Sequence, residues 1–278
     1  PPPPPPTPPP PPPTLFPYTT LFRSVLVFAA GVANVSASSL AEIKQRGTLV
    51  LGTSANMPSM SEKRDGKVVG FDIDLARLMA SGMDVKLEIK TLPFNGLLSA
   101  VESGDVDVVI SNMTINPERN MRVAFVGPYM TSGKCVITKE ENLAKAEAAD
   151  DLNTSNTRLA ALTGSTSAAF TRALLPNAKV TLVDDYESAV KMVNNDKVGG
   201  LLTDYPICLS ILKTHPDAGF VSLFSLLTYE PVGIALAGND PLFLNWTENF
   251  LTRVEGMGLL DELAMRWFGK ADLSDSKD

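Results

Sequence analysis

The chain has 278 residues, 44% of them hydrophobic, and a mean hydropathy of +0.07, which is enough apolar material for one or two domains with cores. Acidic residues outnumber basic ones by 31 to 24 and no basic cluster is present, so neither nucleic acid nor an anionic membrane is expected as a partner. No apolar run reaches the length of a membrane span. Two cysteines and one histidine cannot close a usual zinc site, and we expect no metal or cofactor.

The first 24 residues do not resemble part of a folded domain. More than half of the 22 prolines precede residue 18, and TLFPYTTLFRS (14–24) is the in-frame translation of a widely used short-read sequencing adapter. We therefore interpret residues 1–24 as a disordered sequencing artefact fused to a truncated gene end. A polyproline helix for SH3-type recognition is the alternative.

Residues 25–37, VLVFAAGVANVSA, are apolar and then small, and the final VSA fits signal-peptidase cleavage after Ala37. A buried strand is the alternative, but the small residues at the end disfavour it. We interpret this segment as the remnant of a signal peptide and expect a periplasmic protein. Because no cysteine lies near the cleavage site, we do not expect a lipoprotein.

Between residues 48 and 123, strand-like and helix-like segments alternate. Strands are indicated by apolar or period-two runs, and helices by apolar residues three and four apart or by capping residues such as Asp72 and Asn116. The expected elements are strand 48–54, helix 72–82, strand 85–92, helix 95–104, strand 106–112 and helix 116–123. This order predicts a parallel sheet covered by helices.

The same alternation returns further along the chain, after an extended segment at 126–138. The expected elements are strand 158–162, helix 165–175, strand 179–183, helix 184–196, strand 198–204 and helix 205–215. A second extended segment, 227–238, and two long helices follow. Cys135 and Cys208 are expected to be two unpaired buried thiols, with a disulfide between them as the alternative.

The sequence therefore predicts an α/β protein with two similar lobes. We assign residues 38–132 and 229–272 to lobe 1, residues 133–228 to lobe 2, and residues 273–278 to a tail. Two extended crossings, near Ser132 and Thr228, join the lobes and are expected to act as a hinge, and the last helices are expected to return to lobe 1.

Ligands of open α/β sheets bind at the carboxyl ends of the strands, so the residues that follow each predicted strand are candidates. Small hydroxyls, one aromatic ring, one arginine and one carboxylate stand there, but no nucleophile–base pair and no phosphate-binding glycine loop. Arg119 could be a surface residue, although a cation in the first turn of a helix is better placed if an anion joins it. Asp204 could instead cap the following helix, and Ser165 is expected to be a cap.

Three motifs carry a resemblance. GFDIDLARLMA (70–80), GDVDVVISNMTINPERNMRVAFVGPY (104–129) and LLTDYPI (201–207) resemble the periplasmic solute-binding proteins of polar amino-acid ABC importers, family 3. GIALAGNDP (233–241) and the ending RWFG fit as well, and the likeness covers about residues 42–270. It implies a type II periplasmic-binding-protein fold, or Venus flytrap, that closes on an amino acid and serves a membrane permease. We expect a monomer.

The resemblance also implies roles for single residues. Arg119 falls on the arginine that holds the α-carboxylate of the ligand, with help from Thr114. Asp204 matches the acid that pairs with the α-ammonium, which Ser111 and Asn112 also accept.

In lobe 2, the resemblance places Ser165 and Thr166 at a helix N-terminus that reaches the carboxylate. Phe94 matches an aromatic wall of the side-chain pocket, which Leu162 is expected to share.

Departures from the family pattern bear on the ligand. Met57 and Met60 stand where relatives often carry aromatic residues, and Ser54 stands where binders of basic amino acids place an aspartate. Methionine makes an adaptable apolar wall, so the sequence predicts a neutral amino acid or a related carboxylate as the ligand.

The resemblance leaves one enzymatic alternative open. The same fold in the same compartment includes cyclohexadienyl dehydratase, which acts on prephenate or arogenate and needs a general acid in its cleft. Asp204 is the single candidate acid that the sequence suggests, and the binding role already uses it. We therefore expect a binding protein and not an enzyme.

Overall fold

The computed structural model describes residues 1–3, 40–223 and 228–269. The chain divides into two units, residues 1–34 and 35–278, and the helices and strands named below belong to the second unit. Apart from residues 1–3, the segments interpreted as a sequencing artefact and a signal peptide lie outside the described residues, as does the tail 273–278. Those interpretations stay predictions.

Lobe 1 is built on a five-stranded sheet in the order β5-β1-β6-β13-β7. β1 runs parallel to β5 and β6, whereas β13 runs antiparallel to β6 and β7. The strands are β1 (Thr48–Thr53), β5 (Lys86–Thr91), β6 (Val108–Val109), β7 (Ala124–Ser132) and β13 (Glu230–Leu236). The helices are α1 (Leu40–Arg46), α2 (Phe71–Gly82), η1 (Phe94–Gly96), α3 (Leu97–Glu102), α4 (Pro117–Asn120), α10 (Pro241–Gly256) and α11 (Leu259–Phe268).

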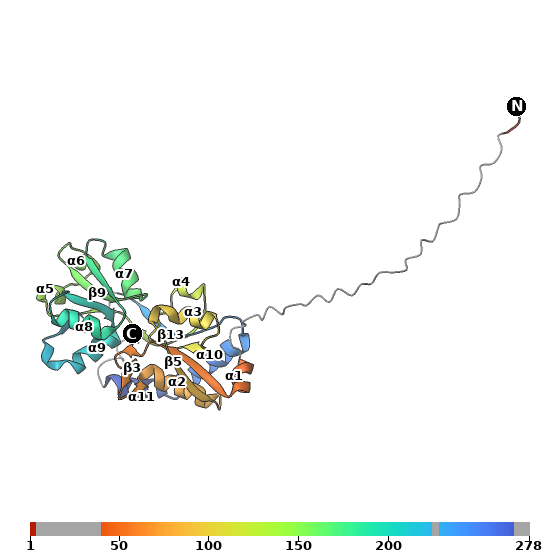
Figure 1. Cartoon of the computed structure of the whole chain (residues 1–278), viewed down its shortest axis with the longest axis horizontal. Coiled ribbons are helices and arrows are strands. Elements are labelled where there is room, and N and C mark those ends of the chain that lie inside the picture. The colour runs from red at the N-terminus through yellow and green to blue at the C-terminus, as the bar shows by residue number, and fades with distance from the viewer. Residues whose placement is uncertain (4–39, 224–227, 270–278) are drawn as a thin grey trace, which may run out of the picture. The chain divides into compact units, whose positions relative to one another are not determined.

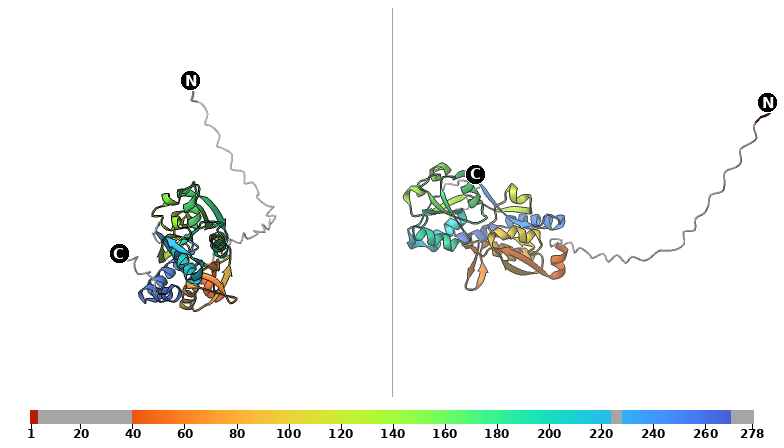
Figure 2. Two further views of the ribbon diagram at one scale, coloured as in Figure 1. Left: turned by 90° about the vertical axis from the view of Figure 1, so that its left-hand side faces the viewer. Right: turned by 45° about the horizontal axis from the view of Figure 1, so that its top comes forward.

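Lobe 2 is built on a second five-stranded sheet in the order β10-β9-β11-β8-β12. In Figures 1 and 2 its green and cyan elements gather on one side, and the orange, yellow and blue elements of lobe 1 gather on the other. The strands are β8 (Lys134–Thr138), β9 (Arg158–Leu162), β10 (Lys179–Val183), β11 (Gly200–Asp204) and β12 (Val221–Leu223). The helices are α5 (Glu141–Ala144), α6 (Ala149–Leu152), α7 (Thr166–Leu174), α8 (Tyr186–Asn194), α9 (Tyr205–Thr214) and η2 (Pro216–Ala218).

The strand–helix alternation expected from the sequence is confirmed in both lobes, but α1, α5, α6, η2 and β12 were not expected, and two further differences stand out. β6 is confined to Val108–Val109, because the chain leaves the sheet and turns at Asn112, which has a φ of 46°. A small antiparallel sheet of β2 (Asn56–Met57), β3 (Ser61–Arg64) and β4 (Lys67–Val69) was not expected. These strands are too short for their sequence alternation to stand out.

Two chain crossings connect the lobes side by side. Glu230, at the start of β13, lies opposite Ser132, at the end of β7, and the backbone N–H of Lys134 donates to the Thr228 hydroxyl at 3.3 Å. The second lobe begins at β8, and a single residue, Gly133, separates β8 from the end of β7. Paired crossings of this kind permit the two lobes to move as bodies about a shared hinge.

The last two helices return to lobe 1, as expected. α10 packs against β7, and α11 packs against α2. Asp74 on α2 fastens α11, because its carboxylate accepts hydrogen bonds from Trp267 Nε1 at 3.0 Å and from the Arg266 guanidinium at 3.2 Å. The C-terminal helices thus close the core on the side of α2.

The expectation of two free thiols is wrong, because Cys135 and Cys208 form a disulfide. Both cysteines are buried, as the sequence indicated, but β8 and α9 pack together and bring the two sulfur atoms into bonding contact. A covalent link between residues 73 positions apart fixes α9 onto the sheet of lobe 2.

Candidate functional site

Arg119 is held at the meeting of the two lobes. Asn116 caps α4 by accepting the backbone N–H of Arg119 at 2.8 Å, and Pro117 opens the helix, as the sequence predicted. The Arg119 guanidinium donates to the Thr114 carbonyl of lobe 1 at 2.8 Å and to the Gly164 carbonyl of lobe 2 at 3.2 Å. It also lies over the ring of Phe94, 5.7 Å from the centroid. A short, well-capped helix thus aims a buried cation into the space between the lobes.

This cation has no carboxylate partner among the described residues. Burial lowers the pKa of Arg119, and the more distant charges of Asp204, Glu230 and Glu118 oppose that shift without cancelling it. Carbonyl oxygens satisfy part of the guanidinium, but they do not neutralise its charge. A carboxylate would, and a planar two-oxygen anion fits the fork of the arginine side chain.

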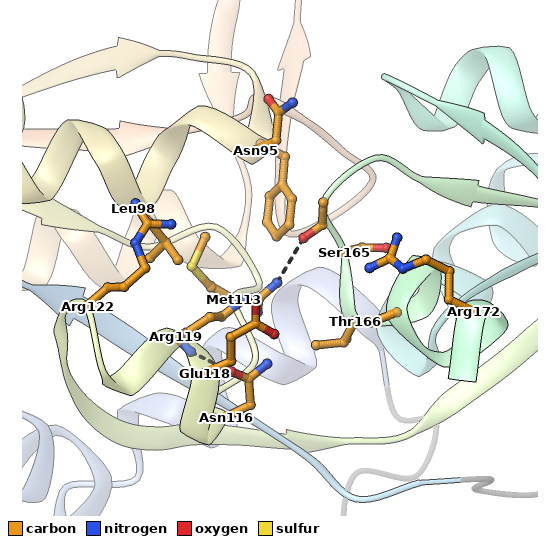
Figure 3. Close-up of a pocket in the computed structure, with 13 residues that line it drawn as sticks. Asn95, Leu98, Met113, Asn116, Glu118, Arg119, Arg122, Ser165, Thr166 and Arg172 are labelled. Carbon is orange, nitrogen blue, oxygen red and sulfur yellow. Dashed lines mark hydrogen bonds between the residues drawn. The ribbon is translucent and has the colours of Figure 1, made fainter. Parts of the chain in front are cut away.

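A pocket of about 240 Å³ opens beside the guanidinium and is lined from both lobes. Figure 3 shows Arg119 pointing from α4 toward the loop that precedes Ser165 and Thr166. Four of the predicted site residues line this pocket, namely Phe94, Arg119, Ser165 and Thr166. A volume of about 240 Å³ is large enough to hold a small carboxylate.

The lobe 2 wall of the pocket is the start of α7. Ser165 is its N-cap, as expected, because its hydroxyl accepts the backbone N–H of Ala168 at 3.1 Å. The same hydroxyl donates to the Leu162 carbonyl at 2.7 Å, which ties the end of β9 to the helix start. Thr166 follows and faces Thr114 of lobe 1, with 3.4 Å between their hydroxyl oxygens.

Asp204 ends β11 and stands at the N-cap position of α9, but its side chain makes no capping hydrogen bond. Its Oδ2 instead accepts Asn112 Nδ2 of lobe 1 at 3.3 Å. Its Oδ1 lies 2.5 Å from the ammonium of Lys134. The alternative interpretation of this acid as a helix cap is therefore wrong.

Lys134 is fully buried and contacts two acids. Besides Asp204, its ammonium lies 3.1 Å from Glu230 and donates to the Thr166 hydroxyl at 2.6 Å. Burial of Glu230 opposes its ionisation, but Lys134 and hydroxyl hydrogen bonds outweigh that effect and lower the pKa of Glu230. Sequence reasoning missed Lys134 and Glu230. A single charged residue entering an otherwise apolar strand was the available signal in each case.

The backbone of Asn112 is held by Asp72, an acid that the sequence analysis wrongly interpreted as a helix cap. Gly70, not Asp72, occupies the N-cap position of α2, and Asp72 is buried in the first turn. Its carboxylate accepts the backbone N–H of Asn112 at 2.8 Å and the Tyr129 hydroxyl at 2.7 Å. Burial raises the pKa of Asp72 to about 7, although both hydrogen bonds act in the opposite direction.

Two serines close the lobe 1 side of the site. The Ser111 hydroxyl accepts the backbone N–H of Ser54 at 3.1 Å and donates to the Ser54 hydroxyl at 3.3 Å. Asn112 lies next to Ser111, and its Oδ1 is buried without a hydrogen-bond partner in the described structure. That oxygen is therefore a buried acceptor whose hydrogen-bonding capacity is unused.

Three predicted apolar residues lie in the core and not at the pocket beside Arg119. Met57, Met60 and Leu162 are buried in the main hydrophobic core, and none of them lines the pocket beside Arg119. Their proposed role as walls of a side-chain pocket stays a prediction. The lobes also meet near the small sheet, where Asn56 Nδ2 donates to the Asp184 carbonyl at 2.9 Å, and a second cavity of about 560 Å³ lies beside that contact.

Within residues 40–223 and 228–269, no group of histidine, cysteine and acidic side chains is placed to hold a metal ion. Within the same ranges, no helix combines the length and the apolar character needed to cross a membrane.

Residues 49–270 match the pattern of the bacterial extracellular solute-binding proteins, family 3. The chain belongs to this family. The L-cystine-binding protein TcyJ of Escherichia coli (strain K12) is 27% identical to this family 3 protein over 245 residues, which cover 86% of this chain and 91% of TcyJ. The glutamine-binding protein of Geobacillus stearothermophilus is 30% identical over 205 residues, or 72% of this chain and 76% of that protein.

Solved structures of other binding proteins share the fold. The ancestral amino acid-binding protein AncCDT-1, a precursor of cyclohexadienyl dehydratase, is 35% identical with a TM-score of 0.77, and the match covers 83% of this chain and 100% of that one. An ABC transporter binding component from Wolinella succinogenes, complexed with lysine, is 34% identical with a TM-score of 0.77, covering 83% and 99%. The two-lobed fold and the family expected from the sequence are confirmed. The named relatives are binding proteins.

Proposed function

We propose that this family 3 protein is the periplasmic binding component of an ABC importer, and that it holds a small neutral amino acid or a related carboxylate between its lobes. The observation that carries the proposal is Arg119, a buried cation that contacts both lobes but pairs with no carboxylate among the described residues. A ligand carboxylate would supply the missing anion. The protein would then act as a monomer that delivers the ligand to a membrane permease.

The expected charge of the ligand follows from the residues at the end of the site away from Arg119. Asp204 and the free Oδ1 of Asn112 offer acceptors for a donor on the α-carbon of the ligand. Ser54 stands where family members that bind basic amino acids place an aspartate, and its hydroxyl is engaged by Ser111. This arrangement supports a ligand without a second positive charge.

Closure of the lobes is the expected consequence of binding. The contact from Arg119 to Gly164 joins the lobes directly, and so does the contact from Asn112 to Asp204. A ligand that accepts from Arg119 of lobe 1 and donates to Asp204 of lobe 2 would bridge the same two lobes. Solution scattering should therefore show a smaller radius of gyration with ligand than without it, and an unchanged radius at saturation would exclude the flytrap motion.

A thermal-shift screen of amino acids and small carboxylates tests the proposal. A ligand present at a hundred times its dissociation constant stabilises the folded state by about 2.7 kcal/mol, which gives a clear shift of the midpoint. We expect neutral amino acids or related acids to raise the thermal midpoint of the wild type, and we expect no such rise for Arg119→Ala. Tight binding of lysine, arginine or histidine would contradict the neutral assignment.

One observation favours a second candidate, an enzyme resembling cyclohexadienyl dehydratase. The sequence suggested a single acid in the cleft, but Glu230 is a second one, and its Oε2 accepts the Thr166 hydroxyl at 3.0 Å. A second acid could serve as a proton donor while Asp204 binds the ligand. Incubation with prephenate or arogenate, followed by assay for product, separates this candidate from the binding function.

A further inference from the structure

Lys134 fills a complete ammonium site made by the protein itself. A lysine ammonium has three N–H donors. Three oxygens surround this one, at 2.5 Å on Asp204, 2.6 Å on Thr166 and 3.1 Å on Glu230. The lysine side chain is 0% exposed, so its ammonium is not in contact with bulk water and depends on these three oxygens.

This site adjoins the place where a ligand would bind. Thr166 lines the pocket beside Arg119 and faces Thr114, whose carbonyl accepts the Arg119 guanidinium. Asp204 is the acid expected to receive the α-ammonium of an amino acid. In the structure, however, one of its oxygens already accepts from Lys134 and the other from Asn112, so a ligand donor would have to share them.

The charges of the cluster show what an incoming ammonium would meet. The cluster of Lys134, Asp204 and Glu230 has one positive charge and two negative ones, and Arg119 adds a second positive charge. A ligand ammonium would have to share Asp204 and Glu230 with Lys134, which already contacts both of them. Displacing that lysine would leave a buried charge unpaired, which is strongly unfavourable.

An α-hydroxyl avoids this competition. It is neutral, so it does not need a carboxylate of its own, and it can donate one hydrogen bond to the unpartnered Oδ1 of Asn112. The carboxylate of an α-hydroxy acid would still pair with Arg119. In a site whose acid served the ligand alone, the same replacement would leave the acid unpaired and would cost on the order of a hundredfold in affinity.

We propose that Lys134 is a specificity-determining residue that supplies the ammonium of the site, so that the protein binds an α-hydroxy acid within about tenfold of the affinity of the matching amino acid. This inference rests on the proposed function, because it takes Arg119 as the carboxylate anchor. It extends the ligand class from amino acids to α-hydroxy acids of the same side chain.

The first experiment compares matched ligand pairs by titration calorimetry. L-alanine with L-lactate, L-leucine with L-leucic acid, and L-phenylalanine with L-phenyllactate are titrated into the wild type. They are also titrated into the charge-balanced double variant Lys134→Met/Glu230→Gln and into Glu230→Gln alone. The double variant leaves Asp204 to the ligand, and its preference for the amino acid should rise at least about tenfold over the wild type. Glu230→Gln, which keeps the lysine, should not show that rise.

The second experiment detects the ammonium site without any transported ligand. Lys134→Ala removes the propylammonium end of the side chain, so added propylammonium should raise the thermal midpoint of this variant but not that of the wild type. Neutral 1-propanol should not reproduce the effect. Lys139→Ala is the matched control, because Lys139 pairs with Asp196 in a largely solvated position and should show no rescue.

The outcomes separate the two proposals. If the wild type binds amino acids more than about a hundredfold better than the hydroxy acids, and the double variant does the same, Lys134 does not set specificity while the proposed function stands. If no pair binds to the wild type, the proposed function fails, and the specificity role fails with it. Absence of propylammonium rescue in a folded Lys134→Ala would show that these oxygens do not form an ammonium site.

Discussion

Arg119 donates a hydrogen bond to the carbonyl of Gly164 across the boundary between the lobes, at 3.2 Å. Gly164 has a φ of +76°, which favours glycine, and an added Cβ would lie 2.8 Å from the Cβ of Asn95 in lobe 1. The lobes therefore approach each other at a point where even one methyl group does not fit.

Gly164→Ala should hinder closure. The left-handed φ costs alanine about 1 kcal/mol of folding stability, and the clash with Asn95 adds a further cost only when the lobes meet. Ligand affinity should therefore fall by more than the small loss in thermal midpoint implies, by roughly tenfold or more. Gly96→Ala is the control, because a Cβ there meets nothing within 4 Å. Equal affinities for Gly164→Ala and Gly96→Ala would contradict the closed contact.

Asp72 should make stability depend on pH. Its folded pKa of about 7 lies above the unfolded value of 3.8, so its contribution is fully present below pH 3.8 and is lost as pH rises toward 7. The free energy of unfolding should fall in that range by up to about 1.4 kcal/mol per pH unit from this group.

Asp72→Asn removes the titrating group, so urea unfolding across the same range should show a flatter pH profile than the wild type. Tyr129→Phe deletes a hydrogen bond that lowers the pKa of Asp72, and the loss of stability should then extend to higher pH. Parallel profiles for all three proteins would show that Asp72 does not titrate in this range.

The disulfide should stabilise lobe 2. Replacing both cysteines by serine, Cys135→Ser/Cys208→Ser, should lower the free energy of unfolding by about 2–4 kcal/mol, because the unfolded chain loses a long covalent loop. Ligand affinity should change little, since neither cysteine lines the pocket beside Arg119. Thiol labelling of the denatured, unreduced wild type gives an independent check: no label is expected, whereas two labelled thiols would restore the original expectation of free cysteines.

Local sequence signals were sufficient to place Arg119 in the first turn of a capped helix, whereas its role toward a ligand stays a prediction. Asn116 and Pro117 mark the start of a helix whatever surrounds it, and an arginine two residues inside that helix must lie near the end of the preceding strand. Cap chemistry acts over a few residues, so it can be interpreted from the sequence. The order of the strands and helices followed from the same kind of short-range pattern.

Long-range pairing explains what was missed. Lys134 is the first residue of an otherwise apolar strand and looks like an ordinary charged boundary, but the antiparallel register of β8 and β11 places it opposite Asp204. That register joins residues 70 positions apart, and no local signal shows it. Asp72 illustrates the same limit, because Tyr129 and Asn112 take the carboxylate that a helix cap would have used.

The central claim is that the planar, charged guanidinium of Arg119 binds the ligand carboxylate. Titration calorimetry of one ligand from the thermal-shift screen tests this claim most directly. Arg119→Lys keeps the charge but loses the two-point geometry, so binding should weaken at least about tenfold. Arg119→Ala should cost on the order of 3–5 kcal/mol, because the ligand carboxylate would be desolvated without a partner. Arg122→Lys is the control, since Arg122 lines the same pocket but pairs with Glu102. If folded Arg119→Ala and Arg122→Lys bind the ligand as tightly as the wild type, the ligand carboxylate does not bind at Arg119.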